Sequence, residues 1–238
     1  WVALEVGKTM TVTSTNLSNS RFKDTDIAKI VREFTVTSAP GNSGKIIANV
    51  YRYPAKTIVV GDSTDSANPL TIKVVDHYYD AAGNEVQAVY NGNSIIAVNS
   101  LNHYNGIRYT ENGETKWAWD DTKHIEKMSV GSNKFIPIPG SSVTEQNGEI
   151  YSLNDNQYLE HGSKFNGNDM GNVKGWDDET APNFYWGSGA LRLYDNHYTF
   201  SVQGNSVGLN TVYWFAINTN IAFPQPPGEE PVKPSEPT

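Results

Sequence analysis

Acidic and aromatic residues stand side by side in two stretches of this sequence, a combination typical of ligand-binding surfaces. The first stretch is TKWAWDD at residues 115–121, and the second is GWDDETAPNFYWGSGALRL at residues 175–193. An aromatic ring can pack on the C–H face of a sugar while carboxylates and amides bond the sugar hydroxyls. The alternative is that these rings cover the core under loops. The candidate ligand-binding residues are Trp117, Trp119, Asp120, Asp121, Trp176, Tyr185 and Trp186.

Three stretches are rich in oxygen donors and could bind calcium. Calcium takes about six to eight hard oxygen ligands from carboxylates, amide and backbone carbonyls, and water. The stretches NDNQ at 154–157, NGND at 166–169 and WDDE at 176–179 offer such oxygens, although none has the spacing of an EF-hand. The alternative is a set of solvated turns. The predicted calcium ligands are Asn154, Asp155, Asn168, Asp169, Asp177, Asp178 and Glu179.

Sequence patterns that would indicate catalysis are incomplete. GNSVG at 204–208 matches the string of a nucleophile elbow, but no Asp or His follows Ser206 to complete a triad. The adjacent acids at 120–121 and 177–178 do not by themselves supply the two opposed carboxylates of a glycosidase. The five histidines show no i, i+4 pair, which disfavours a zinc site. We therefore expect a protein that is not an enzyme, with a carbohydrate-active enzyme as the alternative.

Composition disfavours several classes of partner. The 238-residue chain has a formal net charge of −8, which argues against binding to phosphate backbones or anionic membranes. The chain has no cysteine, so disulfides and thiolate metal sites are excluded. No apolar run approaches the roughly 18 residues of a membrane span. We expect neither nucleic acid binding nor membrane insertion.

Short β-rich segments must position the candidate residues. LTIKVVDHYYD at 70–80, NEVQAVY at 84–90 and TVYWFAIN at 211–218 predict strands, because they are rich in β-branched and aromatic residues. DTDIAKIVREFTV at 24–36 fits either a helix or a strand, with Arg32 interrupting the strand face, and its ending favours the strand. The expected fold is all-β: an antiparallel two-sheet β-sandwich with long loops and few short helices.

Turn residues separate these segments. Asn and Gly tolerate the positive φ that tight turns between antiparallel strands require. Gly187 and Gly189 are expected to bend the chain sharply before Leu191 enters a strand. The five Asn-Gly dipeptides that predict turns begin at Asn91, Asn105, Asn112, Asn147 and Asn166.

The last fifteen residues differ in kind from the rest. PQPPGEEPVKPSEPT at 224–238 contains six prolines and almost nothing apolar. Proline fixes φ and lacks a backbone donor, so this segment should run as extended polyproline II. The predicted organisation is a globular domain at 1–223 and a proline-rich linker, the start of a stalk, at 224–238.

Four longer motifs are the most specific in the chain: FIPIPGSSV at 135–143, GEIYSLNDNQYLEHGSKFN at 148–166, GWDDE with YWGSGAL at 175–191, and WFAINTNIAFP at 214–224. In this order, and with the exit into a proline-rich segment, the chain resembles the variable (V) domain of streptococcal antigen I/II surface adhesins and the related glucan-binding protein C family. The resemblance runs over nearly the whole chain.

The resemblance implies a lectin-like β-supersandwich head, carried between helical and proline-rich stalk segments of an extracellular protein anchored to the bacterial cell wall. It implies adherence to a host glycoprotein, a salivary agglutinin of the scavenger-receptor type, or, in the glucan-binding branch, to α-glucan (dextran). It also implies a calcium ion near a surface crevice. A structural spacer with no ligand of its own remains the alternative from another class.

Overall fold

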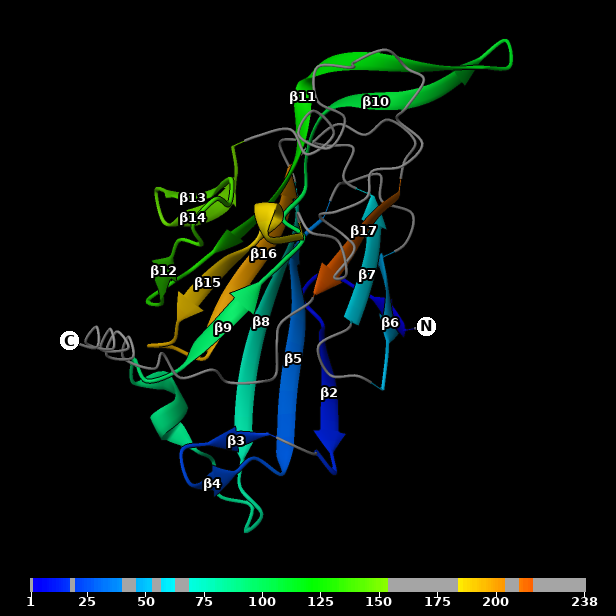
Figure 1. Cartoon of the computed structure of the whole chain (residues 1–238). Coiled ribbons are helices and arrows are strands. Elements are labelled where there is room, and N and C mark those ends of the chain that lie inside the picture. The colour runs from blue at the N-terminus through cyan, green and yellow to red at the C-terminus, as the bar shows by residue number, and fades with distance from the viewer. Residues whose placement is uncertain are drawn as a thin grey trace, which may run out of the picture.

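In the part of the chain that it describes, the computed structural model is an antiparallel β-sandwich with almost no helix, which confirms the predicted fold class (Figure 1). The described residues are 2–17, 20–39, 46–52, 57–62, 69–153, 184–203 and 210–215. Of these, the backbone alone is described at 57–62, 104–111, 114–124, 184, 186, 202–203 and 210–215. All strand pairs within the described part are antiparallel.

The largest sheet has eight strands in the order β13–β14–β11–β16–β8–β5–β2, with β10 paired to β11 outside this path. Its strands are β2 (Thr9–Thr15), β5 (Lys29–Ser38), β8 (Leu70–Tyr79), β10 (His103–Glu111), β11 (Glu114–Ser129), β13 (Val143–Gln146), β14 (Glu149–Ser152) and β16 (His197–Gln203). Strands distant in sequence therefore lie side by side, as where β16 lies between β8 and β11.

Three smaller sheets and two short 3₁₀ helices complete the described fold. The four-stranded sheet has the order β1 (Val2–Leu4), β6 (Ile46–Val50), β7 (Thr57–Asp62) and β17 (Asn210–Phe215). The three-stranded sheet has the order β12 (Lys134–Ile136), β15 (Gly189–Arg192) and β9 (Ile95–Val98). The remaining elements are the pair β3 (Arg21–Phe22) and β4 (Thr25–Asp26) and the 3₁₀ helices η1 (Gln87–Tyr90) and η2 (Phe184–Gly187).

Alternation of side chains along β5 and β8 builds the core. Every second residue of β5 from Ile30 to Val36 is buried, and β8 repeats this pattern from Leu70 to Tyr78. Successive side chains of a strand point to opposite faces, so one face of β5 and β8 is buried and the other is partly exposed. Residues of β6, β9 and β15 join the same hydrophobic cluster, which packs the sheets together. The segment 24–36 thus ends in a strand, as its sequence favours.

Arg32 does not break the buried face of β5 but lies within it, 4% exposed. It stands directly opposite Asp76 of β8. Its Nε and Nη2 donate to the two carboxylate oxygens of Asp76 at 2.6 and 3.1 Å. The hydroxyl of Tyr198 donates to the same carboxylate at 2.7 Å, and the hydroxyl of Tyr90 donates to the Asp76 carbonyl at 2.7 Å. A buried charge is tolerated only when it is paired and bonded in this way.

The surroundings of this polar cluster change its proton affinities. Burial alone would lower the pKa of Arg32, but the charge of Asp76 raises it above its ordinary value. Burial, and then the nearby Asp76 charge, raise the pKa values of Tyr78 and Tyr198 above the usual tyrosine range. The pKa of Tyr90 is also raised, by burial and then by Tyr78. Arg32 and Asp76 are therefore held as an ion pair beside protonated tyrosines at neutral pH.

Two of the predicted Asn-Gly turns close hairpins. Asn112–Gly113, between β10 and β11, has φ values of 55° and 80°, and Asn147–Gly148, between β13 and β14, has 54° and 78°. Positive φ at both central residues is the type I′ geometry that matches the twist of paired strands. The prediction of a turn at Asn105–Gly106 is wrong, because both residues lie inside β10. Asn166–Gly167 lies outside the described residues.

The strand predicted at 84–90 is also wrong. Glu85 forms an isolated bridge to Tyr79, and Gln87–Tyr90 forms η1. In that geometry Val89 is buried and the Tyr90 hydroxyl reaches Asp76, so packing against the core overrides the local β propensity. The boundary near residue 223 and the segment 224–238 lie outside the described residues and stay predictions.

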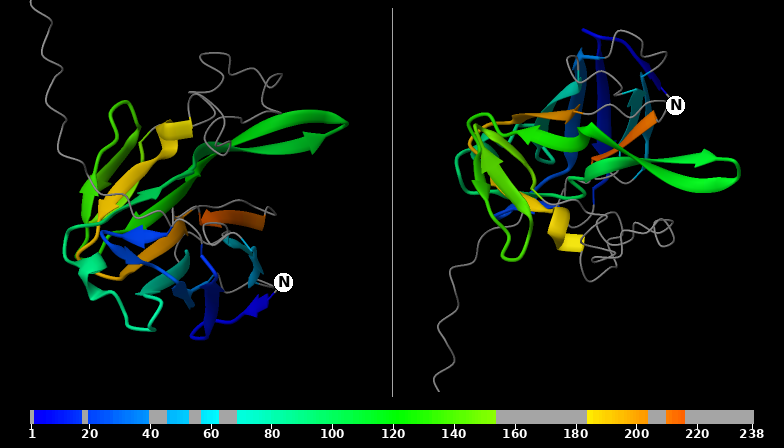
Figure 2. Two further views of the ribbon diagram at one scale, coloured as in Figure 1. Left: turned by 60° about the horizontal axis from the view of Figure 1, so that its bottom comes forward. Right: turned by 90° about the horizontal axis from the view of Figure 1, so that it is seen from above.

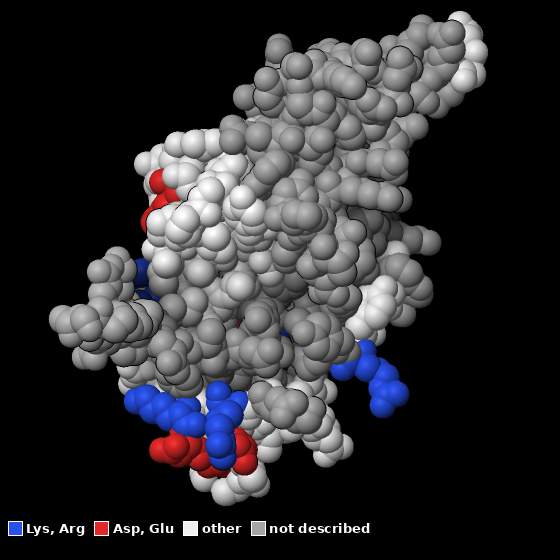
Figure 3. Space-filling view, viewed as in Figure 1, with Lys and Arg blue, Asp and Glu red and all other residues white. Residues whose placement is uncertain are grey.

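Charges on the face shown in Figure 3 are mixed rather than of one sign. Blue and red side chains adjoin at its lower end, where Figure 1 places β3 and β4. In that hairpin, Arg21 Nε bonds Asp26 at 2.8 Å, with both side chains more than 60% exposed. Among the described residues, no helix is long and apolar enough to cross a membrane.

Candidate functional site

A two-stranded arm, residues 103–124, projects from the sandwich (Figures 1 and 2). Its strands pair from Glu111 opposite Glu114 at the tip to His103 near the body. The Asn112–Gly113 turn closes the tip. At Ile125, β11 pairs with both β10 and β16; beyond it, β11 pairs with β16, and its last two residues also pair with β14. One strand thus runs from the exposed arm into the body of the large sheet.

The arm carries four of the seven candidate ligand-binding residues. Trp117 lies opposite Arg108, and Trp119 lies opposite Gly106. Alternate positions of a strand share a face, so the register places the two tryptophans on one face of the arm. Asp120 and Asp121 follow directly in β11. Their contact with a ligand stays a prediction.

A bulge interrupts the arm where these acids lie. Tyr104 pairs with His124, whereas Gly106 pairs with Trp119. Asn105 therefore lies against four residues of β11, Asp120 to Lys123. Extra residues on one strand bend the ribbon and re-aim the side chains around them, and such bulges are over-represented beside functional sites. This is why Asn105–Gly106 lies within a strand pair and not at a hairpin end.

The arm is attached to the body through a buried polar root, residues 101–103. The backbone of Asn102 accepts a bond from the Glu126 N–H and donates one to the Glu126 carboxylate, both at 2.9 Å. The Nδ1 of His103 donates to the Ser152 carbonyl at 2.7 Å. Asn102, His103 and Glu126 are each less than 10% exposed. Because bonded polar groups of low exposure resist rearrangement, the root fixes where the arm begins.

A short aromatic turn, η2, is bonded to this root. The Leu101 N–H donates to the Gly187 carbonyl at 2.9 Å, and the Ser188 N–H donates to the Tyr185 carbonyl at 3.0 Å. The Ser141 hydroxyl donates to the Ser188 carbonyl at 2.6 Å. The Tyr185 ring lies against Gly140, where an added Cβ would be 3.1 Å from the ring, yet Tyr185 is 40% exposed. The turn presents Tyr185 on a fixed backbone, with Trp186 next in the chain.

The role predicted for Gly189 needs correction. Gly189 is the first residue of β15, and the bend lies before it, in η2. Its backbone does not have a positive φ. A Cβ at Gly189 would lie 2.8 Å from the Phe135 ring and 3.3 Å from Val143. Glycine is therefore required here by the close packing of β15 on β12, and not by a turn.

The root brings together chain segments that are far apart in sequence. Within three residues it contacts η2 through Leu101, β11 through Asn102 and β14 through His103. Strand β14 ends at Ser152, just before the oxygen-rich segment, and η2 begins at Phe184, just after it. The root residues could not be predicted from the sequence, because no local pattern marks a contact between positions 24 to 86 residues apart. The candidate residues outside the described part are Trp176, Asn154, Asp155, Asn168, Asp169, Asp177, Asp178 and Glu179.

The described part of the chain contains no group of three or more His, Asp or Glu residues that could hold a metal ion. Three of the histidines have separate roles there. His77 bonds Glu85 at 2.7 Å, His103 of the arm root bonds the Ser152 carbonyl at 2.7 Å, and His197 bonds Asp195 at 2.9 Å. His124 and His161 lack a described side chain. The predicted calcium ligands all lie at 154–183, outside the described residues.

These features define a class of protein: an antiparallel sandwich with a projecting hairpin arm and a short aromatic turn, both rooted at one place. Loops and turns positioned by a rigid scaffold are where β proteins carry binding residues. Comparison with known proteins then gives the family. The chain belongs to the glucan-binding protein C family, whose model matches residues 1–218.

Two similar proteins of solved structure have roles in adherence. Glucan-binding protein C of Streptococcus mutans is 32% identical, with a TM-score of 0.73 over 99% of this chain; its structural analysis provides evidence that it mediates both sucrose-independent and sucrose-dependent adherence. The adhesin domain of PrgB from Enterococcus faecalis is 26% identical over 92% of this chain, with TM-scores of 0.69 alone and 0.67 bound to DNA. This chain spans 64% of the first of these structures and 66% and 70% of the other two.

Proposed function

We propose that this chain is the ligand-binding head of an extracellular, wall-anchored bacterial adhesin, that it is not an enzyme, and that it recognises carbohydrate. Its ligand is either α-glucan or the glycans of a host glycoprotein of the salivary agglutinin, scavenger-receptor type. The helical and proline-rich segments that would carry such a head on a stalk belong to the same proposal.

One observation carries this proposal: the arm and the aromatic turn are bonded to one root at 101–103. Trp117 and Trp119 on the arm and Tyr185 and Trp186 on the turn belong to segments predicted independently as ligand-binding. Membership in the glucan-binding protein C family and the adherence function of the Streptococcus mutans relative support the same role. The exposed ring of Tyr185 supplies apolar contact area at low entropic cost.

Binding to immobilised dextran and to immobilised agglutinin glycoprotein tests the proposal. We expect saturable binding to at least one of them, and no release of reducing sugar from dextran. Reducing-sugar release would favour a carbohydrate-active enzyme instead. Absence of saturable binding to either surface would favour a spacer. Because one similar adhesin domain binds DNA, a DNA-coated surface is a third arm of the experiment, and binding to DNA alone would replace carbohydrate as the proposed ligand.

We also propose that calcium binds to oxygen atoms from the predicted set at 154–155, 168–169 and 177–179. The donors are carboxylates and amides, which suit a hard cation. A ligand that binds only the folded state stabilises it by roughly 2.7 kcal/mol at a hundredfold excess over its Kd. The melting temperature should therefore fall in chelator and recover with calcium but not with sodium. A melt that is identical with chelator and with calcium would reject this cofactor.

A further inference from the structure

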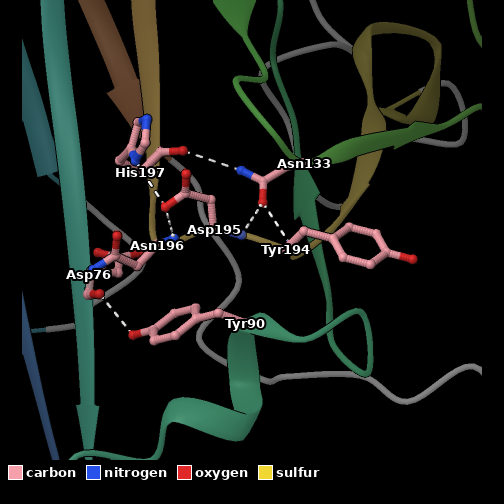
Figure 4. Close-up of polar contacts among 7 residues, drawn as sticks. All are labelled: Asp76, Tyr90, Asn133, Tyr194, Asp195, Asn196 and His197. Carbon is pink, nitrogen blue, oxygen red and sulfur yellow. Dashed lines mark hydrogen bonds and ion pairs between the residues drawn. The ribbon is translucent and has the colours of Figure 1, made fainter.

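Tyr194 is a second exposed aromatic residue, and it belongs neither to the arm nor to the aromatic turn. It lies in the short connection between β15 and β16 and is 43% exposed. Figure 4 shows its side chain directed away from the cluster of polar residues that holds the connection. A single exposed large ring is normal on a protein surface and needs no explanation. A ring whose backbone and far end are held by other residues can present a defined binding surface.

The backbone that carries Tyr194 is fixed by Asn133, which is 5% exposed. The Oδ1 of Asn133 accepts bonds from the N–H groups of Tyr194 and Asp195, at 2.9 and 2.8 Å. Its Nδ2 donates to the His197 carbonyl at 3.1 Å (Figure 4). The Asp195 carboxylate bonds His197 and the Asn196 N–H, so it faces this cluster and not the Tyr194 ring. The connection is held from inside the protein.

The far end of the Tyr194 ring packs closely against Gly92. A Cβ at Gly92 would lie 2.6 Å from Cε1 of the ring and 2.9 Å from its hydroxyl, so only glycine allows this contact. Gly92 also has a φ of 84°. Its N–H donates to the Leu193 carbonyl at 2.7 Å, and its carbonyl accepts from Arg192 Nη1 at 2.9 Å. The amide side chains of Asn91 and Asn93 flank it and bond one another.

Two positive charges lie beside this ring. The Lys134 ammonium is 5.1 Å from the centre of the Tyr194 ring. Lys134 stands directly opposite Arg192 in the β12–β15 pair, and like charges in that position destabilise a sheet. Within the described part of the chain, no acid forms an ion pair with either residue. This like-charge pairing costs stability, although Arg192 also bonds the Gly92 carbonyl and Lys134 also lies over the Tyr194 ring.

We propose that Tyr194, Lys134, Arg192, Asn91 and Asn93 form a second saccharide subsite that takes a sugar ring bearing a carboxylate. The fixed ring offers a surface for the C–H face of the sugar, and the amides can bond its hydroxyls. Lysine and arginine are donors only, so they favour an anionic group over a neutral hydroxyl. The inference rests on the proposed function, because it assumes that the domain recognises glycans.

A single-stranded nucleic acid also combines rings with negative charge, but the structure favours the sugar. Nucleic acid sites stack successive bases on several rings along a positively charged groove. Here a single described ring lies beside two cations. This arrangement has room for one sugar ring rather than for a run of stacked bases.

Methyl β-D-glucuronide and methyl β-D-glucoside test the subsite, because they differ only in a carboxylate in place of a hydroxymethyl group. Chemical-shift titrations of the whole chain should show the glucuronide binding more tightly than the glucoside. Tyr194→Ala should weaken glucuronide binding roughly fivefold to tenfold, the scale of one aromatic contact. Lys134→Gln should weaken it by about twofold to fivefold, as for an exposed ion pair, and remove most of the preference over the glucoside.

Tyr51→Ala is the matched control, because Tyr51 is 41% exposed and lies just after β6 rather than beside Lys134. It should change neither titration. Equal binding of both sugars, an unchanged affinity in Tyr194→Ala, or tighter Tyr194-dependent binding of oligo-dT would each overturn the subsite. Dextran and agglutinin surfaces are measured with the same variants. If the wild-type chain binds neither dextran nor agglutinin, the proposed function is wrong. If it binds one of them but shows no preference for the glucuronide, only this inference is wrong.

Discussion

The two halves of β11 differ in what supports them. Residues 125–129 are paired with β16, and the last two are also paired with β14, so this half lies within the large sheet. Residues 114–124 are paired only with β10 and project from the body (Figure 2). A residue in the inner half contributes to the stability of the whole domain, whereas one in the outer half contributes mainly to the arm. The chain thus separates the parts that hold the fold from the parts that present candidate binding residues.

Buried polar groups follow the same division. The Arg32–Asp76 pair joins β5 to β8 in the middle of the large sheet. The Asn102–Glu126 and His103–Ser152 bonds join the arm to the body. Both sets are buried and bonded, but the first specifies strand register and the second specifies where an exposed element begins. The variants below are ordered by their expected effect on the free energy of unfolding.

Arg32→Met should have the largest effect. Removal of one partner from a buried ion pair leaves Asp76 uncompensated and should lower the free energy of unfolding by about 3–5 kcal/mol. Denaturant titration measures this loss. The double variant Arg32→Met/Asp76→Leu should recover part of it, although the Tyr198 hydroxyl still lacks its acceptor. The control Arg21→Ala breaks an exposed pair and should cost less than about 1 kcal/mol. Equal losses in the two arginine variants would contradict the assigned division.

The second largest effect should come from alkaline pH, which should lower the stability of the buried tyrosine cluster. The folded-state pKa values of Tyr78, Tyr90 and Tyr198 are raised above the unfolded value, so their stabilising contribution is complete below about pH 10 and is lost as pH rises further. As pH rises above the unfolded pKa, each of these tyrosines lowers the free energy of unfolding by up to about 1.4 kcal/mol per pH unit. Tyrosinate absorbance should rise in two stages, exposed residues first and these three with unfolding. A single stage at the ordinary tyrosine pKa would contradict their burial.

A matched pair of glycines sharpens the comparison further. Gly113 at the arm tip and Gly148 between β13 and β14 have φ values of 80° and 78°, and an added Cβ contacts nothing at either position. Alanine in this conformation costs roughly 1 kcal/mol. Gly148→Ala should lower global stability by about that amount, whereas Gly113→Ala should mainly loosen the arm. Hydrogen exchange and thermal melting of the two variants measure this difference. An equal fall in global stability would contradict the assignment of Gly113 to the arm rather than to the body.

Local chemistry in the sequence predicts much of this fold. The Asn-Gly pairs at 112–113 and 147–148 form type I′ hairpins, because positive φ is a local property of those residues. Strands β5, β8 and β17 follow from the composition of the segments predicted at 24–36, 70–80 and 211–218. Asn105–Gly106 and the segment 84–90 were mispredicted, because a bulge and a packed 3₁₀ helix depend on distant partners.

Long-range pairing accounts for what the sequence could not predict in the polar core and at the site. Arg32 looked like an interruption because its partner, Asp76, is 44 residues away. The arm root depends on contacts with residues 126, 152 and 187, and no local pattern indicates them. Tyr194 does carry a usable signal: it precedes Asp195 and Asn196, the same pairing of ring and polar residue that selected Trp119 and Trp176.

The most direct test of the central claim measures ligand binding and melting together for Trp117→Ala, Trp119→Ala and Trp186→Ala. If the arm and the aromatic turn recognise the ligand, at least one variant should lose roughly thirtyfold in affinity for dextran or agglutinin, about 2 kcal/mol. Its melting temperature should stay nearly constant, because the residue is not part of the core. Core tryptophans would instead destabilise the domain by roughly 3–5 kcal/mol. If all three variants lower stability and none weakens binding selectively, these residues are packing groups and the ligand site lies on another face.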